Sequence, residues 1–202
     1  LSFVSCCVAV LSFDPWLQDA AVAQPACSAE QPAPLLPQDA DLCARLAPVI
    51  RHPSALPLDQ YEEALGKYLR GFCYRDAASG WKRDKHVRDT GPFTASLQDG
   101  TWTGAYHGTH APVVVWYSPE MLGWMKVNRP SEESAAPADG PPIPDGAVIV
   151  KEMYPAPAAA CASVDPLKLL PTSGAAVMVR EQKASQDGWF WGWFGWSGWN
   201  PD

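Results

Sequence analysis

Residues 174–194 read GAAVMVREQKASQDGWFWGWF, and they indicate a fold rich in β-strands. It predicts a strand over Ala175–Glu181, rich in β-branched and small apolar residues, and then a polar turn over 182–188. A second strand follows, in which large aromatic residues alternate. One face of that strand carries Trp189, Trp191 and Trp193, and the other carries Phe190, Gly192 and Phe194. The stretch therefore predicts two strands joined by a turn, with much aromatic surface on one of them.

Two further strands are predicted on the N-terminal side of this stretch. Runs of β-branched and aromatic residues predict strands over Ala111–Tyr117 and Gly146–Tyr154. A helix is predicted to begin between them, at 118–120. Ser118 can cap that helix, proline suits its first position, and Glu120 favours the positive end of the helix dipole.

Short helices are predicted earlier in the chain. The apolar periodicity of residues 58–71 predicts a helix that Asp59 caps and Gly71 ends. Residues 39–52 predict another short helix. The polar residues 74–100 predict an irregular ordered loop. Together these elements predict an α+β fold, a mainly antiparallel β-sheet with a few short helices.

Three segments divide the chain. Residues 1–23 predict the remnant of a signal peptide, because an apolar run is followed by small residues at the spacing of a cleavage site. Residues 24–57 predict a Pro-rich linker with a short helix, and residues 58–202 a single domain. A membrane anchor is the alternative for the apolar run, but that run is shorter than the roughly 20 residues of a spanning helix. We therefore expect a periplasmic or secreted protein, free of the membrane after signal cleavage.

The cysteines and the charge support this interpretation. Removal of the signal leaves Cys27, Cys43, Cys73 and Cys161, which can form two disulfides in three connectivities. No pair has the Cys-x-x-Cys spacing of a zinc or redox site. The formal net charge of −7 argues against a nucleic-acid partner, which a basic face would attract.

The aromatic surface of the last strand must be covered by a core, a flat ligand or other protein. Packing in the core is the most ordinary of these explanations for large aromatic residues in strands. A flat ligand leaves two possibilities. Carbohydrate-binding modules stack sugars on exposed tryptophans, and a planar cofactor would use the same kind of surface.

Lys151 and Glu152 interrupt an apolar strand. Because side chains alternate, Ile149, Lys151 and Met153 share one face, and Glu152 lies on the other. A lysine beside apolar neighbours tends to lose its proton and becomes nucleophilic. The alternative is an exposed face, or an ion pair with Arg180 or Glu181 on the next strand.

No metal site is predicted. His107 and His110 form a His-x-x-His pair, but no cysteine or carboxylate of regular spacing accompanies them, and solvated histidines are the more ordinary explanation. The basic loop around His86 can hold an anion such as a propionate, although such loops are more often solvated. The loop includes Lys82, Arg83, Lys85 and Arg88. No nucleophile elbow, phosphate loop or dinucleotide fingerprint occurs.

The order of three motifs resembles the cytochrome P-460 family. These are VVVWYSPEMLGWMK (113–126), PDGAVIVKEMY (144–154) and GAAVMVREQKASQDGWFWGWF (174–194). The resemblance covers about residues 81–199. It implies a periplasmic c-type haem protein that either oxidises hydroxylamine or binds nitric oxide, with electrons passing to a partner cytochrome. A small nitrogenous ligand or substrate, and a homodimer, are further expectations from the family.

The resemblance also implies site residues. Lys151 occupies the position of the lysine that is linked to the porphyrin edge in the hydroxylamine-oxidising members, and it is the candidate catalytic or tuning residue. The implied haem contacts are Lys151, Met153, Trp189, Trp191 and Trp193. The family's Cys-x-x-Cys-His motif, which supplies the haem attachment and the axial histidine, follows the last strand. It is not present in residues 1–202, so we expect this sequence to be a fragment that ends before it.

Overall fold

The computed structural model describes residues 30–85, 87–88, 93–98, 101–106, 113–128, 140–154 and 164–195. Several predictions lie outside these residues: the signal segment 1–23, and the placement of Cys27, Cys161, His86, His107 and His110. The helices are α1 (Ala40–Val49), α2 (Leu58–Arg70) and α3 (Pro119–Asn128), with short 3-10 turns η1 (Pro53–Ala55), η2 (Cys73–Arg75), η3 (Ala77–Ser79) and η4 (Pro166–Lys168). The strands are β1 (Lys82–Arg83), β2 (Phe93–Gln98), β3 (Thr101–Tyr106), β4 (Val113–Tyr117), β5 (Val148–Met153), β6 (Ala175–Arg180) and β7 (Trp189–Phe194).

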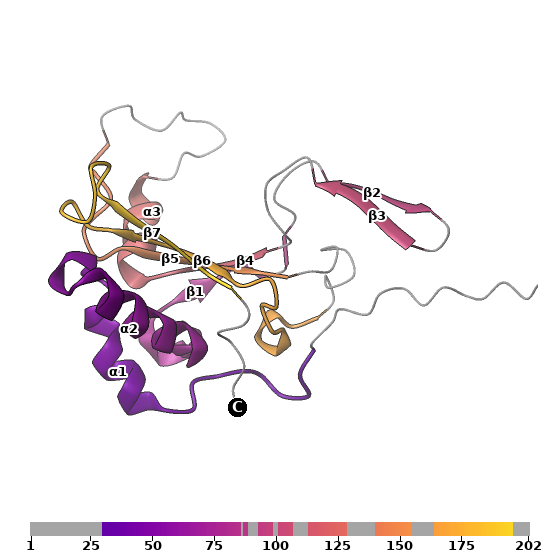
Figure 1. Ribbon diagram of the computed structural model, residues 1–202, viewed down its shortest axis with the longest axis horizontal. Coiled ribbons are helices and arrows are strands. Elements are labelled where there is room, and N and C mark those ends of the chain that lie inside the picture. The colour runs from indigo at the N-terminus through magenta and orange to yellow at the C-terminus, as the bar shows by residue number, and fades with distance from the viewer. Residues whose placement is uncertain are drawn as a thin grey trace, which may run out of the picture.

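Five strands form one antiparallel sheet in the order β1-β4-β5-β6-β7 (Figure 1). The predicted α+β class with a mainly antiparallel sheet is thus confirmed. The β6–β7 hairpin pairs Arg180 with Trp189 at its turn and Ala175 with Phe194 at its open end. Gly188 closes the turn with a φ of 73°, a left-handed conformation that favours glycine, and its carbonyl accepts the Glu181 N–H at 3.0 Å.

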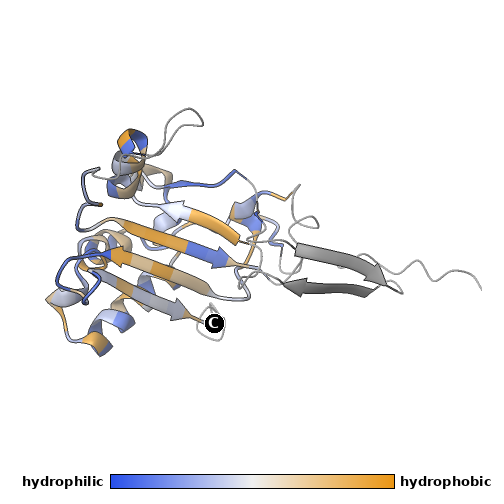
Figure 2. Ribbon diagram, turned by 90° about the horizontal axis from the view of Figure 1, so that it is seen from above, coloured by the Kyte–Doolittle hydropathy of each residue, from blue (hydrophilic) through white to orange (hydrophobic). Residues whose placement is uncertain are grey.

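Helices α1 and α2 cover one face of this sheet (Figures 1 and 2). The amphipathic stripe of α2 supplies Tyr61, Leu65 and Leu69, all buried, and it packs on the apolar side chains that point from the strands toward the helices. Tyr61 meets Phe190 of β7 edge to face, with ring centroids 4.9 Å apart. Phe190 is therefore on the covered face, and the alternation predicted for the last strand holds.

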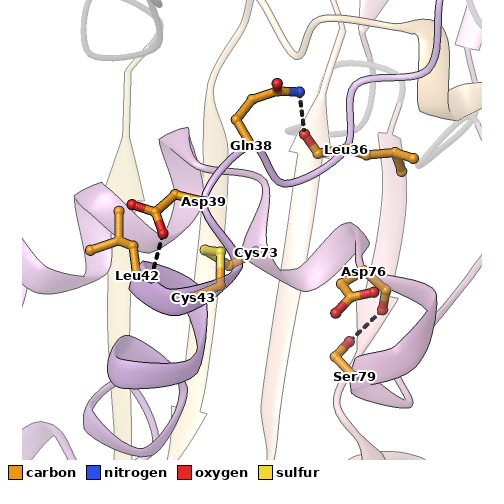
Figure 3. The surroundings of a disulfide bond; sticks show 8 residues. All are labelled: Leu36, Gln38, Asp39, Leu42, Cys43, Cys73, Asp76 and Ser79. Carbon is orange, nitrogen blue, oxygen red and sulfur yellow. Dashed lines mark hydrogen bonds between the residues drawn. A yellow bond between two sulfur atoms is a disulfide. The ribbon is translucent and has the colours of Figure 1, made fainter.

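A disulfide between Cys43 and Cys73 joins α1 to the segment that follows α2 (Figure 3). The Asp39 carboxylate caps α1 by accepting the Leu42 N–H at 2.8 Å. Ile50, directly after α1, belongs to the same core as α2. The short helix predicted within residues 39–52 is therefore present, and it packs with the domain that follows it.

Two sequence predictions were wrong. Residues 74–100 are not an irregular loop: Lys82–Arg83 forms edge strand β1, and Phe93–Gln98 forms β2, which pairs with β3 in a separate antiparallel ribbon. Asp59 does not cap α2, because the helix already begins at Leu58 and follows Pro57 without a side-chain cap. Ser118, in contrast, caps α3 as predicted, with its hydroxyl accepting the Met121 N–H at 3.3 Å.

Among the helices of the described residues, none combines the length and the apolar character needed to cross a membrane.

Candidate functional site: the outer face of the sheet

The face of the sheet opposite α1 and α2, here called the outer face, brings together residues from β4, β5, β6 and β7. Strand register places Val115, Lys151, Ala176 and Trp193 in one row across the strands. The neighbouring row contains Tyr117, Ile149, Met178 and Trp191. Side chains in such rows are direct cross-strand neighbours. The predicted amine and two of the predicted tryptophans thus lie on the same face.

A concavity of about 320 Å³ opens on this face around Lys151. Its lining consists of Arg88, Val113, Val115, Tyr117, Ile149, Lys151 and Met178. The concavity is mainly apolar, with one ammonium and one guanidinium group at its wall. Ligand sites commonly have this composition, a mostly hydrophobic surface with a few polar groups that fix orientation.

The environment of Lys151 changes its acid–base chemistry. Desolvation by the surrounding apolar groups lowers the pKa of its ammonium below the usual value of lysine, and the nearby charge of Arg88 lowers it further. A larger fraction of the amine is therefore neutral at a given pH than for a solvated lysine. The side chain is half-buried, so the amine remains accessible from the concavity.

Arg88 is held at the wall of the concavity by two sets of contacts. Its backbone exchanges hydrogen bonds of 2.8 Å with Val113, and its Nε lies 2.8 Å from the Asp84 carboxylate. The same carboxylate accepts the Val115 N–H at 3.0 Å. Arg88 is thus oriented along the β4 end of the outer face, beside Lys151.

The three tryptophans of β7 differ in exposure. Trp191 is 61% and Trp193 66% exposed, whereas Trp189 is half-buried with the Arg180 guanidinium 5.9 Å from its ring. The rings of Trp189 and Trp191 are 6.0 Å apart and inclined by 41°, so they do not form a coplanar platform. The Trp191 indole N–H donates to Asp187 at 3.1 Å. Packing in the core therefore accounts for the phenylalanines of β7 but not for Trp191 and Trp193.

Met153 also faces outward, but it is nearly covered. It is 8% exposed and packs with Val113 and Val115 at the end of the face, two residues along β5 from Lys151. The structure thus places Met153 in a small apolar cluster beside the concavity rather than in its wall.

Glu152 points to the covered face, where it is the centre of a buried polar network. Its two carboxylate oxygens accept hydrogen bonds from the Tyr74 hydroxyl at 2.5 Å, the Trp116 indole at 2.9 Å and the Tyr154 hydroxyl at 2.8 Å. The Arg75 guanidinium completes the set with an ion pair of 2.5 Å. The Glu152 network lies on the covered face of β5, and Lys151 lies on the outer face of the same strand.

Sequence reasoning missed this network. One alternative for the strand charges was an ion pair with Arg180 or Glu181, but the Arg180 guanidinium instead donates to the carbonyls of Asp187 and Gly188. The alternation of β5 places Glu152 among core residues, and this was the available signal that it needs a buried cation. Nothing in the sequence identified Arg75 as that cation.

The described residues contain no group of three His, Cys, Asp or Glu side chains that is close enough to hold a metal ion. His52 is the one histidine that the structure describes, and its Nδ1 lies 3.4 Å from the Glu181 carboxylate, away from the outer face.

The described residues thus form an α+β fold in which helices cover one face of the sheet, and the other face carries the concavity around Lys151 and the exposed Trp191 and Trp193. No family model matches the chain, and neither a curated protein nor a solved structure matches it. We therefore infer the function from the chemistry of the outer face.

Proposed function

We propose that this is an exported haem-binding protein of the cytochrome P-460 type, which acts in hydroxylamine oxidation or in nitric oxide binding and electron transfer. One observation carries the proposal. The Lys151 amine lies in an apolar concavity, on the same sheet face as two tryptophans that no core packing explains. A flat, largely apolar ligand would cover both.

The residues of the outer face suit a planar macrocycle. The concavity of about 320 Å³ is at the lower end of the range for ligand sites, so a large ring would extend beyond it. Ala176 lies between Lys151 and Trp193 in their row. Its small side chain leaves space above the sheet for a ring. The ring would therefore contact Lys151 and Met178, with Trp191 and Trp193 beside it.

Two cations suit the acidic groups of such a ligand. Arg88 and Lys151 both line the concavity and favour carboxylates at its β4 end. When bound, haem would supply the redox chemistry and the open iron position for a small nitrogenous ligand. The chain itself would orient the ring, exclude water from one of its sides and place an amine at its edge. A partner cytochrome would receive electrons from such a protein, and a homodimer stays part of this proposal.

Export is supported by the disulfide between Cys43 and Cys73. Disulfides persist in oxidising compartments such as the periplasm or the extracellular space. A periplasmic or secreted location is therefore part of the same proposal.

A carbohydrate-binding module is the second candidate, and the exposure of Trp191 and Trp193 favours it. Two observations favour the macrocycle instead. The rings of Trp189 and Trp191 are inclined rather than coplanar, and a concavity lies beside Lys151, where a sugar-stacking platform needs none.

Titration of the purified chain with haemin tests the proposal. We expect a saturable Soret shift together with quenching of tryptophan fluorescence. Trp191→Ala and Lys151→Met should weaken binding about tenfold each, the loss of roughly 1.4 kcal/mol of contact energy. The matched controls are Trp124→Ala on α3 and Lys67→Met on α2, which do not line the concavity and should bind as the unchanged protein does.

Equal binding by the outer-face variants and their controls would contradict the proposal. Calorimetry with soluble oligosaccharides decides between the candidates: binding of a sugar that Trp191→Ala abolishes, without haemin binding, would favour the carbohydrate module.

A further inference from the structure

The position of Lys151 has a chemical consequence that does not depend on haem. Its amine lies at the wall of a concavity built by Val113, Val115 and Ile149, which remove water from around the ammonium group. The lysines Lys67, Lys82, Lys85, Lys126 and Lys183, in contrast, are exposed. Lys151 is thus set apart from them by a shaped, apolar environment that can also receive a small molecule.

We propose that Lys151 is a covalent capture site for small planar carbonyl compounds that carry an anionic group. The lone pair of the neutral amine attacks the carbonyl carbon and forms the new C–N bond. The carbonyl oxygen then leaves as water, together with the two hydrogens of the amine, and a C=N double bond remains. The condensation is reversible and needs neither an oxidant nor a reductant.

The charged groups around the amine favour its neutral, reactive form. Desolvation and the positive charge of Arg88 both lower the pKa of Lys151. Lys82 of β1 lies opposite Tyr117 of β4, and Asp84 forms its ion pair with Arg88 rather than with the amine. Among the described residues that line the concavity, none carries a carboxylate that would hold the ammonium form.

The side chains around Lys151 also favour carbonyl compounds with a ring and an anionic group. Ile149 and Met178 line the same concavity as Lys151, and their apolar side chains suit contact with an aromatic or conjugated ring. Arg88 lines the concavity on the β4 side, and its guanidinium suits a phosphate or carboxylate on that ring. A haem on the outer face would cover the amine, so capture is a reaction of the haem-free protein, and a captured compound would block haem loading.

Labelling with pyridoxal 5′-phosphate tests the inference, with sodium cyanoborohydride added to reduce the imine to a stable amine. Peptide mapping by mass spectrometry then gives a rate for each lysine. At about pH 7 we expect Lys151 to be labelled severalfold faster than Lys126, because desolvation and the charge of Arg88 lower the pKa of Lys151. At about pH 11, above the ordinary pKa of lysine, the ratio should fall toward one, because the lowered pKa of Lys151 then gives no advantage. Pyridoxal without the phosphate should react more slowly at Lys151, and Arg88→Gln should remove that preference.

Two results would overturn the inference: equal labelling of Lys151 and Lys126 at neutral pH, or a phosphate preference that Arg88→Gln leaves unchanged. A thermal melt of Arg88→Gln verifies that the variant is folded. The outcome is separable from the haem proposal. Selective labelling without haemin binding would contradict only the haem proposal, whereas haemin binding without selective labelling would contradict only carbonyl capture.

Discussion

Arg75 and Glu152 form a fully buried ion pair across 77 residues of sequence. The guanidinium Nε lies 2.8 Å and a terminal nitrogen 2.5 Å from the same carboxylate oxygen, and both side chains are completely inaccessible to solvent. The negative charge of Glu152 raises the pKa of Arg75 above its already high value, because it compensates the loss of hydration. Each charge is therefore tolerated in the core because the other is present.

Removal of one partner should be strongly destabilising. Glu152→Gln leaves the Arg75 cation without its counter-charge, and we expect the free energy of unfolding to fall by about 3–5 kcal/mol. The double variant Arg75→Met/Glu152→Leu should lose less than the sum of the single changes, because it buries no isolated charge. Urea denaturation of the unchanged protein, of Arg75→Met, of Glu152→Leu and of the double variant measures this coupling. Additive losses would show that the pair does not act as a unit.

Four buried tyrosines should make the fold sensitive to alkali. Desolvation raises the pKa of Tyr61, Tyr68, Tyr74 and Tyr154, and Glu152 raises those of the last two further. Phenols of the unfolded chain ionise near pH 10. Their contribution to stability is thus complete below about pH 10 and is lost as the pH rises above that value. We expect the phenolate absorbance of these four tyrosines to appear together with the loss of near-ultraviolet circular dichroism. Their ionisation while the circular dichroism stays native would contradict this expectation.

The disulfide should make a large contribution to stability. The Cys43–Cys73 bond closes a loop with a sequence separation of 30, for which chain entropy predicts about 3–4 kcal/mol. The double variant Cys43→Ser/Cys73→Ser should therefore melt well below the unchanged protein. Dithiothreitol should lower the melting temperature of the unchanged protein but affect the variant less. If the reductant lowered the melting temperatures of both proteins equally, the Cys43–Cys73 bond would not be the source of the stabilisation.

Truncation of two neighbouring residues of β7 should change stability by very different amounts. Phe190→Ala removes a partly buried ring from its contact with Tyr61, and we expect a loss of about 2 kcal/mol, less than for a fully buried phenylalanine. Trp191→Ala removes an exposed ring and should change stability by at most about 0.5 kcal/mol. Thermal melts of the two variants provide the comparison. A large loss for Trp191→Ala would show that this ring is a packing residue rather than a ligand contact.

Much of the sheet could be predicted from the sequence, because alternation and β-branched residues act locally. The strands predicted over Gly146–Tyr154 and Ala175–Glu181 are present as Val148–Met153 and Ala175–Arg180. The ribbon of β2 and β3 was missed although a signal was present. Asp99-Gly100 separates the two strands, and this dipeptide favours a two-residue hairpin. The polar character of the neighbouring loop obscured that signal.

The site was predictable only in part. Alternation along β5 correctly separated Lys151 from Glu152, since this depends on one strand alone. The concavity around Lys151 depends on strand register and on Arg88, and the partner of Glu152 comes from a turn 77 residues away. Such long-range pairings leave no periodic trace in a single sequence.

The hydrogen bonds of Arg75 also limit how far the chain can be shortened from its N-terminal side. Besides Glu152, its guanidinium donates to the carbonyl oxygens of Leu35 at 3.4 Å, Leu167 at 3.2 Å and Leu169 at 3.1 Å. One side chain thus ties together a segment before α1, a turn after β5 and the centre of the sheet. A shortened protein that begins at residue 58, the predicted domain boundary, would lack the Leu35 carbonyl that accepts from Arg75. It would also lack Cys43, and therefore the disulfide. The shortest piece suitable for crystallisation therefore begins before Leu35.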